Sequence, residues 1–438
     1  MKEKPVFPLL VSMALPMVIS MLVNSLYNIV DSFFVAQISE DAMTALSLVY
    51  PVQNFVNAVA IGFGIGLNAV ISYYLGAGDK KAAGCAATQG LALTMLHAVI
   101  LTIGSLLVIE RFLRMFSSSE TVIDLGVRYS RIIFLFTIAI MANLYFEKVF
   151  QAVGRMKVTM TGMMVGCIVN IILDPLLIFG IGPFPALKVT GAAIATIIAQ
   201  MVVTLLFLFF ASQDQILFHH IHLLQAPDSK KASEIFRLGL PSCLQSLVFT
   251  GISMTIARLV AGYGDAAVAV QKVGAQIESI SWMTSDGFAS AVNSFIAQNH
   301  GAGKEDRIHA GYRSALKIVL PWGLFCTILL VCFPTPIFKI FITEPDVIPM
   351  GISYLMILGF SQLFSSLEIT TSGAFCGYGR TMPPSITGIT LNLLRIPMAL
   401  ALTATPLALS GIWWSISITS ILKGLILFIW FQITIKKK

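Results

Sequence analysis

Two acidic side chains in the first half of the chain lie deep inside long apolar stretches. Asp31 and Asp174 both stand among residues that hydropathy assigns to membrane spans. A charged group at the centre of a span costs roughly 2.5–3.5 kcal/mol on insertion scales, so such residues usually line a cavity. No Lys or Arg of the same spans is placed to neutralise them. Two acids in one cavity do not both stay ionised cheaply, so one would hold a proton that it can exchange for a cation.

Polar residues precede Asp31 at helical spacing. They form one stripe at positions i, i+3, i+4 and i+7 of a single helix, namely Asn24, Tyr27, Asn28 and Asp31. We expect the first three to line a cavity or contact a substrate. For the two Asn residues, a hydrogen bond between helices is an equally good alternative.

The second acid has a polar neighbour on its own helix. Asn170 stands four residues before Asp174, so the two share one face, and Pro175 directly afterwards loosens the helix. Thr196, in the next apolar stretch, is a further cavity-lining candidate. Asp31, Asn170 and Asp174 are therefore predicted to form the coupling site for H⁺ or Na⁺, with Na⁺ bound by these three residues if it is the coupling ion.

The second half of the chain carries charges of both signs inside its spans. The acids are Glu278, Asp286 and Glu368, and the bases are Arg258, Lys272 and Arg395. Internal ion pairing that rigidifies this half is the favoured interpretation, with Arg395 as a structural counter-ion. The alternative is that Glu278 or Glu368 contacts the substrate. The sequence leaves the roles of these charges open.

The elements that must hold these residues are membrane-spanning helices. Charged residues make up 11% of the chain and hydrophobic residues 57%, which no soluble protein surface can accommodate. A span needs about 20 apolar residues, and no ten-residue alternation suggests a barrel. We expect an all-α integral membrane protein with about twelve spans near 10–36, 45–74, 84–109, 122–147, 159–182, 189–211, 236–262, 267–298, 308–333, 347–376, 384–404 and 407–433.

The net charge of +7 indicates topology rather than nucleic-acid binding. With an intracellular N-terminus, the loops and ends on the cytoplasmic side carry most of the basic residues, including Lys80, Lys81, Arg155, Lys230 and Lys231. We therefore expect a multi-pass protein of the inner (plasma) membrane with both termini in the cytoplasm.

The two halves of the chain repeat each other at a spacing of about 220–225 residues. Five motifs recur in order, pairing 14–16 with 239–241, 76–79 with 301–304, 154–156 with 379–381, 170–175 with 392–397 and 191–192 with 411–412. Six spans per half make this a parallel repeat of two bundles. We expect an N-lobe over 1–211, a cytoplasmic linker over 212–234 and a C-lobe over 235–438.

Other motifs favour ordinary structural roles. His219, His220 and His222 resemble a metal cluster, but a solvated linker is the better interpretation. The glycines at 62, 64 and 66 lie inside an apolar span with no strand before them, so they suit close helix packing rather than nucleotide binding. No Walker-type motif is present, so ATP is not the expected energy source, and no cofactor is expected.

Several motifs resemble those of the multidrug and toxic compound extrusion (MATE) family. They extend through both halves and include Leu15-Pro16, Asn28-Ile29-Val30-Asp31, Leu75-Gly76-Ala77-Gly78, Gln151-Ala152-Val153-Gly154-Arg155 and Asp174-Pro175. The resemblance implies a V-shaped, two-lobed exporter of cationic amphiphilic drugs driven by proton or sodium entry. The chain is most similar to the DinF branch, whose coupling is attributed to the matching N-lobe acids. It departs from the NorM branch, because Phe249 and Ser365 fall near the C-lobe positions where acids are expected.

The most probable function from sequence is a secondary antiporter that exports organic cations by alternating access, as a monomer in the bilayer. A lipid-linked precursor flippase of the same superfamily is the alternative, although it would need extra helices and a cationic cavity. A polytopic membrane enzyme or a channel is less favoured, because no clustered metal-binding or catalytic motif is present.

Overall fold

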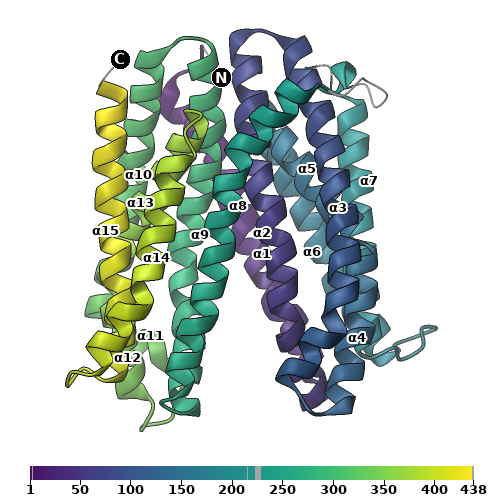
Figure 1. The fold of residues 1–438 in the computed structure, drawn as a ribbon, viewed down its shortest axis with the longest axis vertical. Helices are drawn as coiled ribbons and strands as arrows, with labels where there is room; N and C mark the ends of the chain where they lie inside the picture. Colours follow the sequence, from purple (N-terminus) through teal and green to yellow (C-terminus); the bar gives the residue numbers. More distant parts are fainter. Residues whose placement is uncertain (2, 215, 222–227, 437–438) are drawn as a thin grey trace. The chain divides into compact units, whose positions relative to one another are not determined.

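The structure is a computed structural model that describes residues 1, 3–214, 216–221 and 228–436. Within these residues the chain is helical and contains no strand (Figure 1). The helices of the first half are α1 (Val6–Ala36), α2 (Glu40–Ala77), α3 (Lys80–Phe116), α4 (Glu120–Leu135), α5 (Thr137–Val153), α6 (Met156–Phe179), α7 (Val189–Ser212) and the short 3₁₀ helix η1 (Phe218–His220). Those of the second half are α8 (Ser229–Ala261), α9 (Asp265–Gly301), α10 (Glu305–Cys332), α11 (Pro334–Lys339), α12 (Ile348–Gly359), α13 (Gln362–Gly377), α14 (Met382–Thr403) and α15 (Leu409–Lys436).

The prediction of an all-helical membrane fold is confirmed. Nine helices of the described chain are long and apolar enough to cross a membrane, and two bent pairs bring the number to eleven. The bent pairs are α4 with α5, at 49°, and α12 with α13, at 45°. The remaining predicted span, 267–298, lies in α9, whose 37 residues are long enough to cross. Residues such as Gln271, Lys272 and Glu278 lower its hydropathy, because they serve the interior of the protein.

The chain forms two compact units, Ile19–Gly239 and Met1–Val18 together with Leu240–Lys438. We call them the N-terminal and the C-terminal unit. Their boundaries lie inside α1 and α8, close to the internal prolines Pro16 and Pro241, where a helix loses a backbone hydrogen bond. The first turns of each opening helix therefore pack apart from the rest of that helix. The lobe limits drawn from the sequence, 1–211 and 235–438, stay a prediction.

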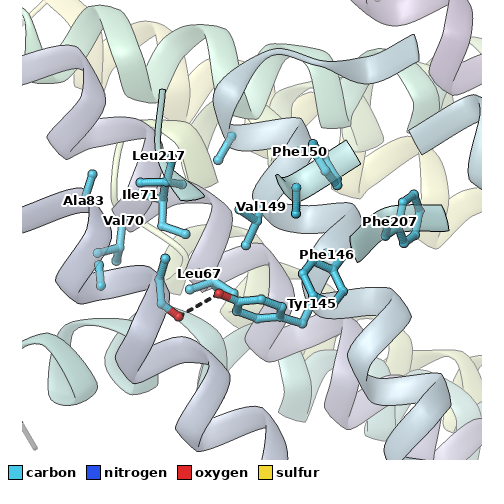
Figure 2. Close-up of a cluster of buried hydrophobic side chains, with 14 of the residues drawn as sticks. Leu67, Val70, Ile71, Ala83, Tyr145, Phe146, Val149, Phe150, Phe207 and Leu217 are labelled. Atoms are coloured by element: carbon cyan, nitrogen blue, oxygen red, sulfur yellow. Dashed lines mark hydrogen bonds between the residues drawn. The ribbon is translucent and has the colours of Figure 1, made fainter. Parts of the chain in front are cut away.

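Aromatic residues of α5 and α7 form the core of the N-terminal unit (Figure 2). The Phe150 ring lies 5.7 Å from that of Phe207, and both side chains are fully buried. The Tyr145 hydroxyl donates a 2.9 Å hydrogen bond to the Ala87 carbonyl of α3, so the one polar atom of this ring is satisfied. This packing fixes α5 against α2, α3 and α7.

The linker is packed rather than solvated where the structure describes it. Leu217 is fully buried in the same aromatic core. Asp214, also fully buried, accepts hydrogen bonds from the backbone of Leu217 and its neighbours and pairs with Arg155 at 3.1 Å. Gly84 permits the contact, because a Cβ there would lie 2.5 Å from the His220 carbonyl oxygen. Sequence reasoning missed this because apolar residues are sparse in the segment.

Beyond the described gap the chain enters α8 through an aspartate cap. The Asp228 carboxylate accepts from the backbone N–H groups of Lys230 and Lys231 at 2.9 and 3.2 Å. These two donors, that of Lys231 first, hold the pKa of Asp228 below its usual value. His222 of the predicted histidine cluster lies outside the described residues, and within them no three metal-binding side chains gather.

Candidate ion-coupling site

Helix α6 buries Asn170 and Asp174 completely in the N-terminal unit. The Asn170 amide nitrogen donates to the Asp174 carboxylate at 3.4 Å, as their four-residue spacing predicts. The same nitrogen lies 3.5 Å from the Thr196 hydroxyl of α7, which is also 3.5 Å from the Tyr27 hydroxyl of α1. Three helices thus bring four of the predicted site residues together.

The two predicted acids meet in this cluster. The carboxyl groups of Asp31 and Asp174 lie within hydrogen-bonding reach of each other. Asp31 Oδ1 and Asp174 Oδ2 are buried, and neither receives a hydrogen bond from any described residue. Two carboxyl groups in contact have only acceptors when both are ionised, so a shared proton or a bound cation satisfies them. This arrangement can exchange one positive charge for another.

Sequence reasoning missed two polar residues at the cluster. The buried Tyr129 hydroxyl of α4 interacts electrostatically with both carboxyl groups and receives a 3.4 Å hydrogen bond from Gln53 of α2. The signal was present, because Gln53 and Tyr129 are polar side chains inside predicted spans. A single sequence does not show which face of each span looks inward.

Two members of the predicted polar stripe do not join the acids. Asn24 and Asn28 are exposed on α1, and the Asn28 amide donates to the Asn24 backbone carbonyl at 2.9 Å. Only Tyr27 and the half-buried Asp31 of this stripe reach the cluster. Cavity lining by the two Asn residues stays a prediction.

A separate ion pair lies at the opposite end of the predicted fourth span. The Lys148 ammonium lies 3.1 Å from the Glu147 carboxylate, and Gln151 bridges the pair with contacts of 3.2 and 2.7 Å. Lys148 was missed because the predicted span ends at residue 147. Since these two charges compensate each other, Asp31 and Asp174 are the buried acids of the N-terminal unit without a basic partner among its described residues.

Helix α9 places Glu278 in the C-terminal unit beside the bend between α12 and α13. The Glu278 carboxylate accepts hydrogen bonds from the Tyr354 hydroxyl at 2.7 Å and from the Gln362 amide at 2.9 Å. Gln362 also donates to the Leu358 carbonyl at 3.0 Å, which the bend leaves free. Glu278 is therefore held by neutral donors.

The predicted pairing role of Arg395 is wrong in its partner. The Glu368 carboxylate pairs at 3.0 Å with Lys423, a buried residue of α15 that sequence reasoning overlooked. Arg395 instead donates to the hydroxyl groups of Thr419, at 2.9 Å, and Ser420, at 3.0 Å. Arg258 and Lys272 are exposed. An ion pair does rigidify this unit, but Lys423 supplies its cation.

The fold and the buried carboxyl cluster are those of a polytopic membrane transporter rather than an enzyme. The MatE family profile matches residues 16–176 and 241–401, which together exceed half of the chain. The chain therefore belongs to the MATE family of transporters. The two matched segments also coincide with the internal repeat.

Relatives with similar sequences are transporters along almost their whole length. A FAD transporter of Shewanella oneidensis is 28% identical over 428 residues, covering 96% of this chain and 93% of that protein. The probable multidrug resistance protein NorM of Thermotoga maritima is 27% identical over 409 residues, covering 92% and 87%. The multidrug export protein MepA of Staphylococcus aureus is 25% identical over 428 residues, covering 97% and 93%. Assignment to the DinF branch stays a prediction.

Solved structures show the same fold. A MOP superfamily transporter from Pyrococcus furiosus matches with a TM-score of 0.91 and 26% identity, covering 100% of both chains. A crystal structure of MATE in complex with MaL6 matches with a TM-score of 0.92 and covers 99% of this chain and 97% of that one, at 24% identity. The chain is accordingly a multi-pass membrane protein.

Proposed function

We propose that this protein is an ion-coupled antiporter that exports organic compounds, cationic or amphiphilic, across the plasma membrane by alternating access. The Asp31–Asp174 pair carries the proposal, because two buried carboxyl oxygens in one cluster have no donor among the described residues. The printed names of NorM and MepA support the substrate class, since both denote multidrug transporters. The lipid-linked precursor flippase is less well supported, because an acidic cluster repels a pyrophosphate.

The proposed exchange is a competition for negative charge. A coupling ion, H⁺ or Na⁺, binds the Asp31–Asp174 pair and neutralises it. Asn170 orients Asp174 through the 3.4 Å hydrogen bond, and Thr196 and Tyr27 close the cluster on the side of α7 and α1. Neutralisation weakens the attraction of the site for a cationic substrate, which then leaves. With the termini in the cytoplasm, both acids stand in the outer half of the bilayer, as their positions along α1 and α6 predict.

Ethidium efflux in everted membrane vesicles tests this proposal. The expected result is transport that stops when either the proton gradient or the sodium gradient is collapsed, and that Asp31→Asn abolishes at normal protein abundance. The Asp124→Asn variant is the matched control, because Asp124 is an exposed acid paired with Arg128 at 2.9 Å. Full efflux by a well-expressed Asp31→Asn protein would refute the coupling role.

A further inference from the structure

Antiport at the Asp31–Asp174 pair makes no use of the two buried cations of the C-terminal unit. Arg395 and Lys423 are 7% and 5% exposed, and they lie close enough to repel each other electrostatically. Glu368 neutralises Lys423 at 3.0 Å. No carboxylate of the described chain lies within 4.0 Å of the Arg395 guanidinium. The interior of this unit therefore holds a guanidinium without an anion in direct contact.

Both nearby acids are already satisfied by other side chains. Glu368 has its ion pair, and Glu278 accepts hydrogen bonds from Tyr354 and Gln362. If the role of Arg395 were to pair with either acid, its planar fork would make the two-point contact that arginine and carboxylate favour. It contacts neutral hydroxyl groups instead. A buried charge without a counter-ion is strongly unfavourable, which indicates that its partner comes from outside the chain.

The geometry at Arg395 leaves donors for such a partner. A guanidinium has five N–H groups, and the structure uses one at Nε, on Thr419, and one at Nη2, on Ser420. The two hydroxyl groups fix the plane of the fork. On α14, Asn392 lies three residues earlier on the same face, 2% exposed, with its Oδ1 atom unpartnered among the described residues. Arginine and amide side chains together commonly bind carboxylate and phosphate groups.

We propose that Arg395 is an anion-binding residue of the substrate site, oriented by Thr419 and Ser420. The transported compounds then carry a carboxylate or phosphate group, as zwitterions or organic anions, and purely cationic compounds are poorer substrates. This inference rests on the proposed export of organic compounds and narrows their chemical class.

A pair of fluorescent probes that differ only in one phosphate group tests the inference. Riboflavin and riboflavin 5′-phosphate are titrated into the full-length protein in nanodiscs, and binding is followed by flavin fluorescence. We expect the wild type to bind the phosphorylated probe at least about tenfold more tightly, since hydrogen bonds to charged groups contribute about 1.5–3 kcal/mol. Arg395→Gln should remove this preference by weakening only the phosphorylated probe. Arg258→Gln, which alters an exposed arginine of the same unit, should retain it.

Three results would overturn the assignment. They are equal or absent binding of the two flavins by the wild type, an unchanged preference in Arg395→Gln, and an equal loss of both flavins in that variant at an unchanged elution profile. If Arg395→Gln does not fold, Arg395→Lys carries the test, because it keeps the charge, loses the fork and should reduce the preference several-fold. Equilibrium binding needs no ion gradient, so the outcome is independent of the efflux test of coupling.

Discussion

Equivalent positions of the two units have acquired different charges. Gln53 and Tyr129 form a neutral pair in the N-terminal unit, and Glu278 and Tyr354, each 225 residues later, form an acidic pair in the C-terminal unit. The contact shortens from 3.4 Å to 2.7 Å, because the second pair joins a hydroxyl donor to a carboxylate. The repeat thus keeps the contact between the same two helices and changes its chemistry.

A second equivalent position shows the same divergence. Asn143 of α5 makes a 2.9 Å hydrogen bond to the Gln200 backbone of α7, and its amide oxygen accepts from Thr204 at 2.7 Å. The residue 225 positions after Asn143 is Glu368, which pairs with Lys423 of α15. The N-terminal unit joins these helices with neutral amides and keeps its charge for the Asp31–Asp174 pair. The C-terminal unit compensates its charge internally, except at Arg395.

The largest expected effect tests whether this ion pair is structural. Glu368→Ala should destabilise the protein by about 3–5 kcal/mol, because it leaves the Lys423 ammonium buried and unpaired. The matched change Asn143→Ala should cost about 1–2 kcal/mol, since it removes neutral hydrogen bonds only. Denaturant unfolding in mixed micelles measures both. If Lys423→Ala added to Glu368→Ala restored no stability, the pair would not be the source of the effect.

The tyrosine pair gives a smaller, graded comparison. Tyr354→Phe should cost about 1.5–3 kcal/mol, because a charged acceptor loses its donor. Tyr129→Phe removes the weaker contact with Gln53 and should cost about 0.5–1 kcal/mol. The same unfolding measurement applies. Equal losses for the two variants would mean that Glu278 is not ionised in the folded protein.

The smallest expected effect concerns the exposed part of the α1 stripe. Asn28→Ala removes a hydrogen bond to the backbone of its own helix, so stability should change by less than about 0.5 kcal/mol. Ethidium efflux should stay within about twofold of the wild type. Tyr27→Phe, by contrast, removes a hydroxyl that contacts the cluster and should reduce efflux more. A stronger loss in Asn28→Ala than in Tyr27→Phe would return Asn28 to the candidate site.

Sequence reasoning predicted the helical membrane fold because its signal is local and strong. An apolar run of about 20 residues has few alternatives in a bilayer. It also predicted that Asn170 and Asp174 share a face, since a spacing of four residues decides this within one helix. The contact between Asp31 and Asp174 followed from assigning both acids to comparable depth.

Partners on other helices could not be predicted in the same way. Lys423 was overlooked inside an apolar stretch, and only the packing of α13 against α15 shows that Glu368 is its partner. The folded linker was missed because Asp214 and Leu217 become buried only through contact with Arg155 and the aromatic core. Such contacts depend on helix rotation and tertiary packing, which hydropathy does not specify.

Competition between substrate and coupling ion at the Asp31–Asp174 pair is the central claim. Ethidium is titrated into purified protein while released protons are counted, and the titration is repeated at several Na⁺ concentrations at constant ionic strength. The wild type should release about one proton per ethidium bound, or bind ethidium more weakly as Na⁺ rises. Asp31→Asn should show neither effect at an unchanged elution profile, because one acceptor of the pair is gone. The same competition in Asp31→Asn as in the wild type would contradict the account.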